Sequence, residues 1–234
     1  MDTLSQRPFQ GVVDTDSLRT YIQRVYAWMV GGLMVTALTA LGVASSFELQ
    51  SLVFGNMMTR WVIMLAPLGI VFFLQARIEH IKPSTAATLF LVYSMMLGLS
   101  LSSIFIVYEL GSVASTFFIA AGTFAGAAIY GYTTKKDLSS IGSFMMMGVI
   151  GLIIAMIVNY FLGSSVLDFA ISIIGVIVFT GLTAYDMNKI KDQAVVMYAG
   201  EGRAAKMTII SALHLYLDFL NLFLFLLRLL GSRR

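Results

Sequence analysis

The chain has 234 residues, of which 59% are hydrophobic and only 12% are charged, and its mean hydropathy is +0.88. A soluble domain carries about 25% charged residues, so a water-surrounded core cannot absorb this much apolar surface and lipid must be the solvent. The net charge of +3 comes without a basic stripe that interleaves with aromatics. We therefore expect no nucleic-acid partner, and the absence of cysteine excludes disulfides and thiolate sites.

The N-terminal segment, residues 1–25, is polar and acidic in part and precedes the first long apolar run. Within it, Leu18, Tyr21, Ile22 and Val25 recur at helical spacing with basic residues opposite. This pattern predicts a cytoplasmic N-terminal segment with a short interfacial helix. An ordinary helical extension of the first span is an equally good interpretation.

Seven apolar runs then follow, each long enough to cross a bilayer, which takes about 20 residues. They cover residues 26–46, 61–78, 85–108, 112–132, 141–162, 166–188 and 206–230. We predict an all-α integral membrane protein with a single seven-helix transmembrane domain over 26–230 and a basic tail at 231–234. The connections at 109–111 and 163–165 are so short that the helices they join should be antiparallel neighbours.

Basic residues predict the orientation, because they gather on the cytoplasmic side of a membrane protein. Eleven Lys and Arg residues fall on the side of the N-terminus and four on the other side. The N-terminus should be cytoplasmic and, with seven spans, the C-terminus external. Arg228, Arg233 and Arg234 are the exception to the count, and they keep open a six-span alternative in which one run is re-entrant.

Small and loop residues have structural interpretations. Gly122, Gly126 and Gly131 recur along the fourth span and predict close packing against another helix. Asp137 follows two lysines and precedes the fifth span, where it should cap the helix. The sequence contains no nucleophile constellation, metal-ligand cluster or phosphate loop, and we expect no enzymatic activity and no cofactor.

Two aspartates inside apolar runs point to a function. Asp218 lies in the middle of the last run and Asp186 closes the sixth. A carboxylate at the centre of a bilayer costs roughly 2.5–3.5 kcal/mol on insertion scales, so it usually faces a bundle interior or a wet cavity. Two carboxylates that meet in a low dielectric cannot both ionise easily, and we expect the pair to share a proton near neutral pH.

Polar residues accompany both aspartates. At about 100° per residue, Ser211, His214, Asp218 and Asn221 share one edge of the last helix. Thr183 precedes Asp186 by three residues on the sixth. We expect the two polar edges to face each other, and their oxygen atoms suit a hard cation such as calcium.

Each of these residues also has a structural interpretation. Asp186 lies near a helix end and could be a solvated interface residue, and Asp218 could serve only as a hydrogen-bonded structural group. His214 is a better hydrogen-bond partner than a metal ligand. Either the nearby carboxylate keeps His214 protonated near neutral pH, which is the outcome that we favour, or burial keeps it neutral. Asn221 fits a role in helix packing.

Four segments closely resemble the Bax inhibitor family, the transmembrane Bax-inhibitor-motif proteins. They are Thr183-Ala184-Tyr185-Asp186-Met187-Asn188-Lys189-Ile190-Lys191, Leu215-Tyr216-Leu217-Asp218-Phe219-Leu220-Asn221-Leu222-Phe223, Gly131-Tyr132-Thr133-Thr134-Lys135-Lys136-Asp137-Leu138-Ser139 and Gly98-Leu99-Ser100-Leu101-Ser102-Ser103-Ile104-Phe105. The first two are the most specific. The likeness runs from about residue 20 to the end and is greatest to bacterial inner-membrane members.

The resemblance implies a fold in which six helices surround the C-terminal one. It also implies a pH-sensitive calcium leak with an aspartate dyad as sensor, here Asp186 and Asp218. In some relatives a basic residue at the cytoplasmic end of the second helix latches the sixth-helix aspartate. Arg77 and Lys82 both lie near that place, and spacing does not choose between them.

Three functions are alternatives to a dyad-gated cation leak. The main alternative is a non-conducting membrane regulator that binds other membrane proteins, such as a membrane protease. A proton-coupled transporter is a weaker candidate. An intramembrane aspartyl protease would also use two aspartates on adjacent helices, but Leu217 stands before Asp218 where such a protease has glycine.

Overall fold

The protein is an all-helical bundle, and the computed structural model describes residues 15–193 and 201–234. Its helices are α1 (Thr15–Ala44), α2 (Phe47–Phe54), α3 (Met57–Arg77), α4 (Pro83–Val107), α5 (Leu110–Thr133), α6 (Ser139–Leu162), α7 (Ser165–Gln193) and α8 (Glu201–Leu230). All but α2 are long and apolar enough to span a membrane. The seven predicted spans are confirmed, and the six-span alternative is not what the fold contains.

The helix ends follow from local sequence. Asn56 caps α3 through its Oδ1, which accepts a hydrogen bond from the Met58 amide at 2.9 Å. Pro83 occupies the first turn of α4, where no amide partner is lost. Gly163 ends α6 with a φ of 62°, a left-handed conformation that favours glycine, and α7 starts two residues later.

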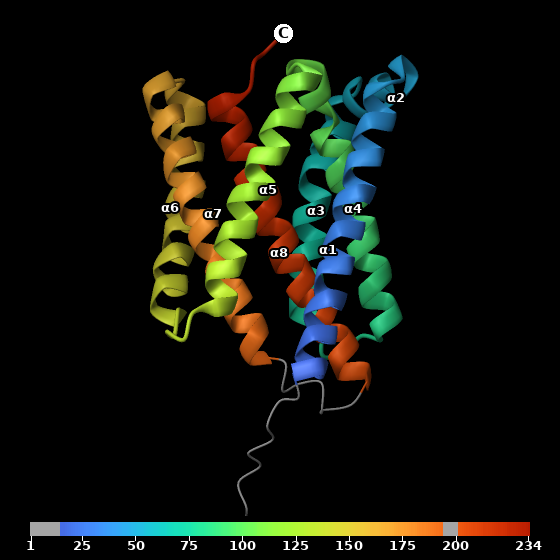
Figure 1. The fold of residues 1–234 in the computed structure, drawn as a ribbon. Coiled ribbons are helices and arrows are strands. Elements are labelled where there is room, and N and C mark those ends of the chain that lie inside the picture. The colour runs from blue at the N-terminus through green and yellow to red at the C-terminus, as the bar shows by residue number, and fades with distance from the viewer. Residues whose placement is uncertain (1–14, 194–200) are drawn as a thin grey trace, which may run out of the picture.

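Helix α8 forms the centre of the bundle (Figure 1). In the most apolar stretch of each span, 72% of the α8 residues are buried, against 39% for α7 and between 11% and 28% for the other five. Helices α1, α4, α5 and α7 pack directly on α8, while α3 packs on α4 and α6 on α7. The predicted arrangement of six helices around the last one is confirmed.

The core of the bundle is organised around Tyr216 of α8, which is fully buried. Its ring makes edge-to-face contacts with Phe90 and Tyr93 of α4. Its hydroxyl lies 2.6 Å from Oγ1 of Thr36 on α1, which also donates to the carbonyl of Ser94. The Thr36 hydroxyl thus links α1 to both α4 and α8 and fixes the positions of the three helices along one another.

The predicted interfacial helix at the N-terminus is part of α1 instead. From Thr15 onward the chain continues without interruption into the first span, so the extension interpretation is the correct one. Tyr21 is buried, and its hydroxyl lies 2.9 Å from Oγ of Ser211 on α8. Burial against α8 outweighs the amphipathic pattern. Residues 1–14 of the predicted N-terminal segment lie outside the described residues.

Short connections do not always make neighbours. Helices α6 and α7, joined at Gly163, pack along each other as predicted. Helices α4 and α5 are joined by an equally short connection but contact each other sparsely. The reason is that each of them packs better elsewhere, α4 on α1 and α5 on α7. The prediction that α4 and α5 are packed antiparallel partners is therefore wrong.

Of the three glycines predicted to allow close helix packing on α5, only one lies against another helix. A methyl group added at Gly131 would collide with the backbone of Ala184 on α7, whereas Gly122 and Gly126 face open space. Asn188 of α7 donates to the Gly131 carbonyl at 3.2 Å. Close packing of α5 on α7 thus depends on Gly131, and the expectation for the other two glycines is not met.

Candidate functional site

The two intramembrane aspartates meet between α7 and α8, the helices that pack directly against each other. Asp186 of α7 and Asp218 of α8 line the same cavity, and their carboxyl groups interact with each other. Asp218 is only 5% exposed, and its Oδ2 is buried without a hydrogen-bond partner among the described residues. An unpartnered buried oxygen of this kind is costly in an apolar interior and is typical of a functional site.

The aspartate pair lines a cavity of about 450 Å³ between α6, α7 and α8. Its polar lining consists of Gln75, Asp186, Lys189, His214, Asp218 and Asn221, and the rest of the lining is mainly aliphatic, methionine and phenylalanine side chains. The cavity thus combines an apolar wall with a few convergent polar groups, which is typical of binding sites in membrane bundles.

A smaller cavity of about 160 Å³ lies next to it, toward the ends of α7 and α8 that border the 194–200 connection. Asp186, Lys189 and His214 line both cavities. Ser211 and Gln193 add polar groups to the smaller one. A cluster of three titratable side chains therefore lies at the junction of the two cavities.

Lys189 is the basic residue beside Asp186. It follows Asp186 by three residues, so both side chains leave α7 on the same face, and it interacts electrostatically with both Asp186 and His214. Its Nζ also lies 5.8 Å from the centre of the Tyr185 ring. The spacing to Asp186 was available in the sequence and would have identified Lys189.

The two latch candidates lie elsewhere. Arg77 ends α3 and Lys82 precedes α4, and both side chains are exposed. Neither lines the cavities at Asp186, whereas Gln75, one half-turn before Arg77, does. The latch between the second helix and the dyad stays a prediction.

The supporting polar residues divide into two groups. His214 and Asn221 line the dyad cavity, as the helical spacing predicted. Ser211 lies one turn before His214 on α8, and its hydroxyl is hydrogen-bonded to that of Tyr21 on α1. Thr183 is fully buried, but its hydroxyl donates to the Phe179 carbonyl of its own helix and it lines neither cavity. The polar side chains of α7 that meet α8 are therefore Asp186, Lys189 and Gln193, the last of which accepts a hydrogen bond from Ser211 at 3.5 Å.

The predicted cap at α6 is found in a modified form. Oδ1 of Asp137 accepts a hydrogen bond from the Ser139 amide at 2.8 Å, at the first residue of the helix. Hydrogen bonds from the Ser139 side chain and backbone hold the pKa of Asp137, which lies outside the membrane spans, below its ordinary value. Its carboxylate form is thus the one that fits the helix start.

The donor set at the dyad suits a weakly held cation. Calcium takes six to eight oxygen ligands, and Asp186 and Asp218 offer four carboxylate oxygens. Oδ1 of Asn221 is a further acceptor, because its Nδ2 already donates to the Leu217 carbonyl. The remaining ligands would be water. Over residues 15–193 and 201–234 no group of three or more His, Asp or Glu side chains has the arrangement of a tight metal centre.

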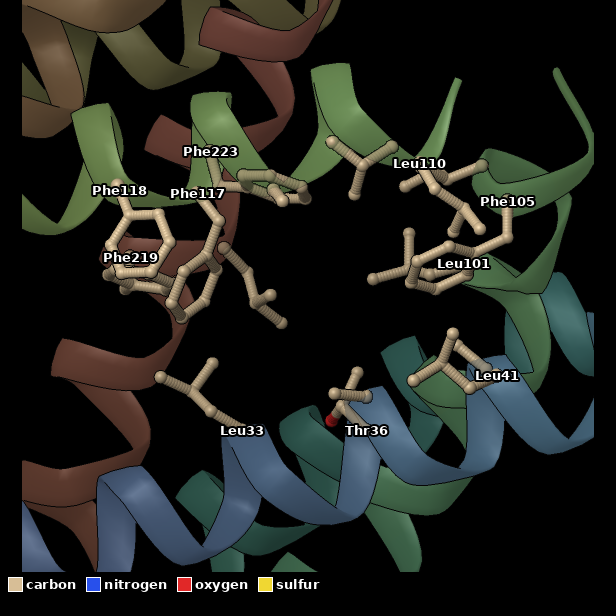
Figure 2. Close-up of a pocket in the computed structure, with 16 residues that line it drawn as sticks. Leu33, Thr36, Leu41, Leu101, Phe105, Leu110, Phe117, Phe118, Phe219 and Phe223 are labelled. Atoms are coloured by element: carbon tan, nitrogen blue, oxygen red, sulfur yellow. The ribbon is translucent and has the colours of Figure 1, made fainter. Parts of the chain in front are cut away.

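A second large cavity, of about 420 Å³, is apolar. It lies between α1, α4, α5 and α8, where α4 and α5 diverge (Figure 2). Leu33 and Thr36 of α1 form one wall, and Phe117 of α5 and Phe219 of α8 form part of another. The Thr36 hydroxyl is already bonded to Tyr216. This cavity has no charged lining residue and is unsuited to an ion.

Comparison with known proteins gives a consistent result over nearly the whole chain. Residues 18–234 match the family model described as Inhibitor of apoptosis-promoting Bax1. The chain is 45% identical to the inner membrane protein YbhL of Escherichia coli over 218 residues, 93% of each chain. It is also 44% identical to a protein of Rickettsia prowazekii, over 94% of this chain and 92% of the relative, and 42% identical to one of Borreliella burgdorferi, over 92% of both.

Proposed function

The chain belongs to the Bax inhibitor family of multi-pass membrane proteins, and from that premise we propose that it is a pH-sensitive cation leak channel, not an enzyme, with calcium as the permeant ion. Asp186 and Asp218 form the sensor. The similarity to YbhL supports a place in a bacterial inner membrane. The basic residues support a cytoplasmic N-terminus and an external C-terminus.

The pair formed by half-buried Asp186 and buried Asp218 carries this proposal. Two carboxyl groups in contact inside a bundle hold one proton between them more easily than none. With Lys189 charged and His214 neutral, loss of the last proton makes the junction net negative, and a second proton makes it net positive. Protonation near neutral pH therefore changes the field that a cation meets between the two cavities.

The position of three titratable side chains at the junction of the two cavities supports a route for the ion from one cavity to the other. Asp186, Lys189 and His214 line the smaller cavity and the larger one. An ion that enters from the 194–200 end meets these three side chains before it reaches Asp218. The dyad is then both the site of weak binding and the group that responds to pH.

The test is calcium flux into proteoliposomes that hold the purified full-length protein, measured with an enclosed calcium dye between about pH 5.5 and pH 8. Asp186→Asn and Asp218→Asn should each alter the flux and flatten its pH response, because each removes a titratable member of the pair. The double variant should differ little from either single one, since contacting residues couple.

Asp137→Asn is the matched control. It makes the same chemical change at an aspartate outside the spans and keeps the Oδ1 acceptor used by Ser139. Its pH profile should equal that of the unmodified protein. If both dyad variants keep that profile as well, the dyad is structural and the sensor proposal is wrong. An unmodified protein that passes no cation at any pH would instead support the non-conducting regulator.

A further inference from the structure

A polar cavity lies at the opposite end of the bundle from the 194–200 connection. It has a volume of about 330 Å³, and its polar lining consists of Tyr108, Asn159, Tyr160, Asp168, Arg228 and Arg233. Met156 and Ile171 form its apolar floor. The residues come from α6, α7, α8, the α4–α5 connection and the C-terminal tail. None of its polar residues lines the dyad cavity, and Met156 is the one residue that lines both.

The C-terminal tail, residues 231–234, is fixed in place by backbone hydrogen bonds. The Ser232 carbonyl accepts from the Glu109 amide at 3.1 Å, and the Arg234 amide donates to the Val107 carbonyl at 3.0 Å. The Ser232 amide also donates to Oγ of Ser112 at 2.8 Å. The last residues of a chain are usually poorly ordered unless they are tied down. These hydrogen bonds hold the backbone of the tail and so determine where the Arg233 side chain lies.

That side chain is Arg233. The backbone of Arg233 forms an antiparallel β-bridge with Tyr108, and the guanidinium carbon of Arg233 lies 5.8 Å from the centre of the Tyr108 ring. Gly231 makes this geometry possible, because a methyl group there would lie 2.7 Å from two carbons of the Tyr108 ring. Stacking on an aromatic ring orients the planar guanidinium and leaves its N–H groups free to donate.

The charge of the cavity favours an anion. Arg228 and Arg233 face it with a single carboxylate, Asp168. Arg228 Nη1 lies 3.9 Å from Asp168 Oδ1, longer than a hydrogen bond, and both side chains are about 40% exposed. One positive charge is left over. Asn159 adds a donor, since its Oδ1 already accepts from the Ser164 amide and its Nδ2 hydrogens remain.

The surroundings identify the source of the anion. Tyr160 and Phe161 are 85% and 81% exposed at the same end of α6, where aromatic rings mark the membrane–water interface. Apolar side chains of α6 and α7 continue from there toward the bilayer centre. Phosphate is the planar guanidinium's preferred partner, and at this depth the bilayer presents phosphate on lipid headgroups.

We propose that this cavity binds the phosphate of an anionic phospholipid in the leaflet that borders the C-terminus. Arg228 and Arg233 bind the phosphate, Asn159 donates to it, and Asp168 faces it as the one repulsive group. The site also explains why the basic tail violates the charge rule: these arginines pair with lipid headgroups at the external surface.

The experiment measures lipid binding to the delipidated full-length protein in detergent by native mass spectrometry. Phosphatidylglycerol and phosphatidylcholine with identical acyl chains are the probes. The unmodified protein should bind phosphatidylglycerol about tenfold more tightly. Both lipids carry the phosphate, but the surplus positive charge of the cavity repels the choline cation of phosphatidylcholine. Arg233→Gln should abolish this preference.

Two further variants separate position from charge. Gly231→Ala keeps every arginine but displaces the tail from Tyr108, and it should also lose the preference. Arg234→Gln removes the same charge from a side chain that does not line the cavity, and it should keep the preference. Equal binding of both lipids by the unmodified protein, or a preference that survives Arg233→Gln, would overturn the proposal. Displacement of phosphatidylglycerol by an equal concentration of inorganic phosphate would assign the cavity to a soluble anion and overturn the lipid assignment.

Discussion

The contact between α5 and α7 at Gly131 can be tested with one methyl group. In Gly131→Ala the added carbon would lie 2.9 Å from the carbonyl carbon of Ala184 and nearer still to its oxygen. Carbon atoms attract best at about 3.5–4.0 Å, so the two helices must move apart by about 1 Å. The neighbouring atoms are backbone, which cannot turn aside as a flexible side chain would.

The cost has two parts. Overpacking of a well-filled contact typically costs about 1–3 kcal/mol. The same displacement stretches the 3.2 Å hydrogen bond from buried Asn188 to the Gly131 carbonyl, and a buried polar group left unpaired costs about 1–3 kcal/mol. Together these predict a loss of about 2–6 kcal/mol.

The assay is thermal unfolding of the purified protein in detergent, followed by circular dichroism. At about 2–4 °C per kcal/mol for a chain of this size, Gly131→Ala should lower the midpoint by roughly 4–24 °C. Gly126→Ala on the same helix is the matched control. Its methyl group meets open space, and alanine favours a helix over glycine by up to about 1 kcal/mol, so its midpoint should stay or rise.

Equal midpoints for Gly131→Ala and Gly126→Ala would refute the close approach of α5 and α7. A second measurement connects the contact to the site. Ala184 precedes Asp186 by two residues, so a displaced α7 moves the dyad. Calcium flux through Gly131→Ala should therefore lose its normal pH profile, while that of Gly126→Ala should not.

Three further predictions concern charge and orientation. Lys189→Gln should move the half-maximal pH of calcium flux upward by as much as about one unit, because loss of a nearby positive charge makes ionisation of the dyad harder; an unmoved midpoint would remove Lys189 from the mechanism. In the same flux assay, neutralising both Arg77 and Lys82 with glutamine should raise the leak at high pH alone if the inferred latch exists, and no change at either pH removes it. Because the chain has no cysteine, single cysteines at positions 136 and 234 can be labelled with a membrane-impermeant maleimide in intact and opened membranes. Position 234 should react from outside and position 136 only after opening; protection of position 234 would contradict the seven-span orientation.

The sequence alone determined the spans and the two aspartates of the dyad. Lipid offers no hydrogen bonds to the backbone, so an apolar run of about 20 residues must be a helix wherever it lies. The cost of a carboxylate in lipid likewise marks Asp218 without knowledge of any neighbour. Helical spacing also placed His214 and Asn221 on the edge that lines the dyad cavity.

Only the tertiary structure decided which face meets which. Gly122, Gly126 and Gly131 look alike in the sequence, but only Gly131 lies against another backbone. Periodicity fixes the direction in which a side chain leaves its own helix. It does not fix the neighbouring helix, which depends on how distant segments share the space around α8.

The same limit explains the other differences. The start of α1 is amphipathic enough to lie at the membrane interface. Its hydrogen bond to α8, however, joins Tyr21 and Ser211, which are 190 residues apart in the chain. The C-terminal tail looks like four free residues, yet partners near residue 108 fix it in place. Such contacts join segments far apart in the sequence, and their energy exists only when the bundle has formed.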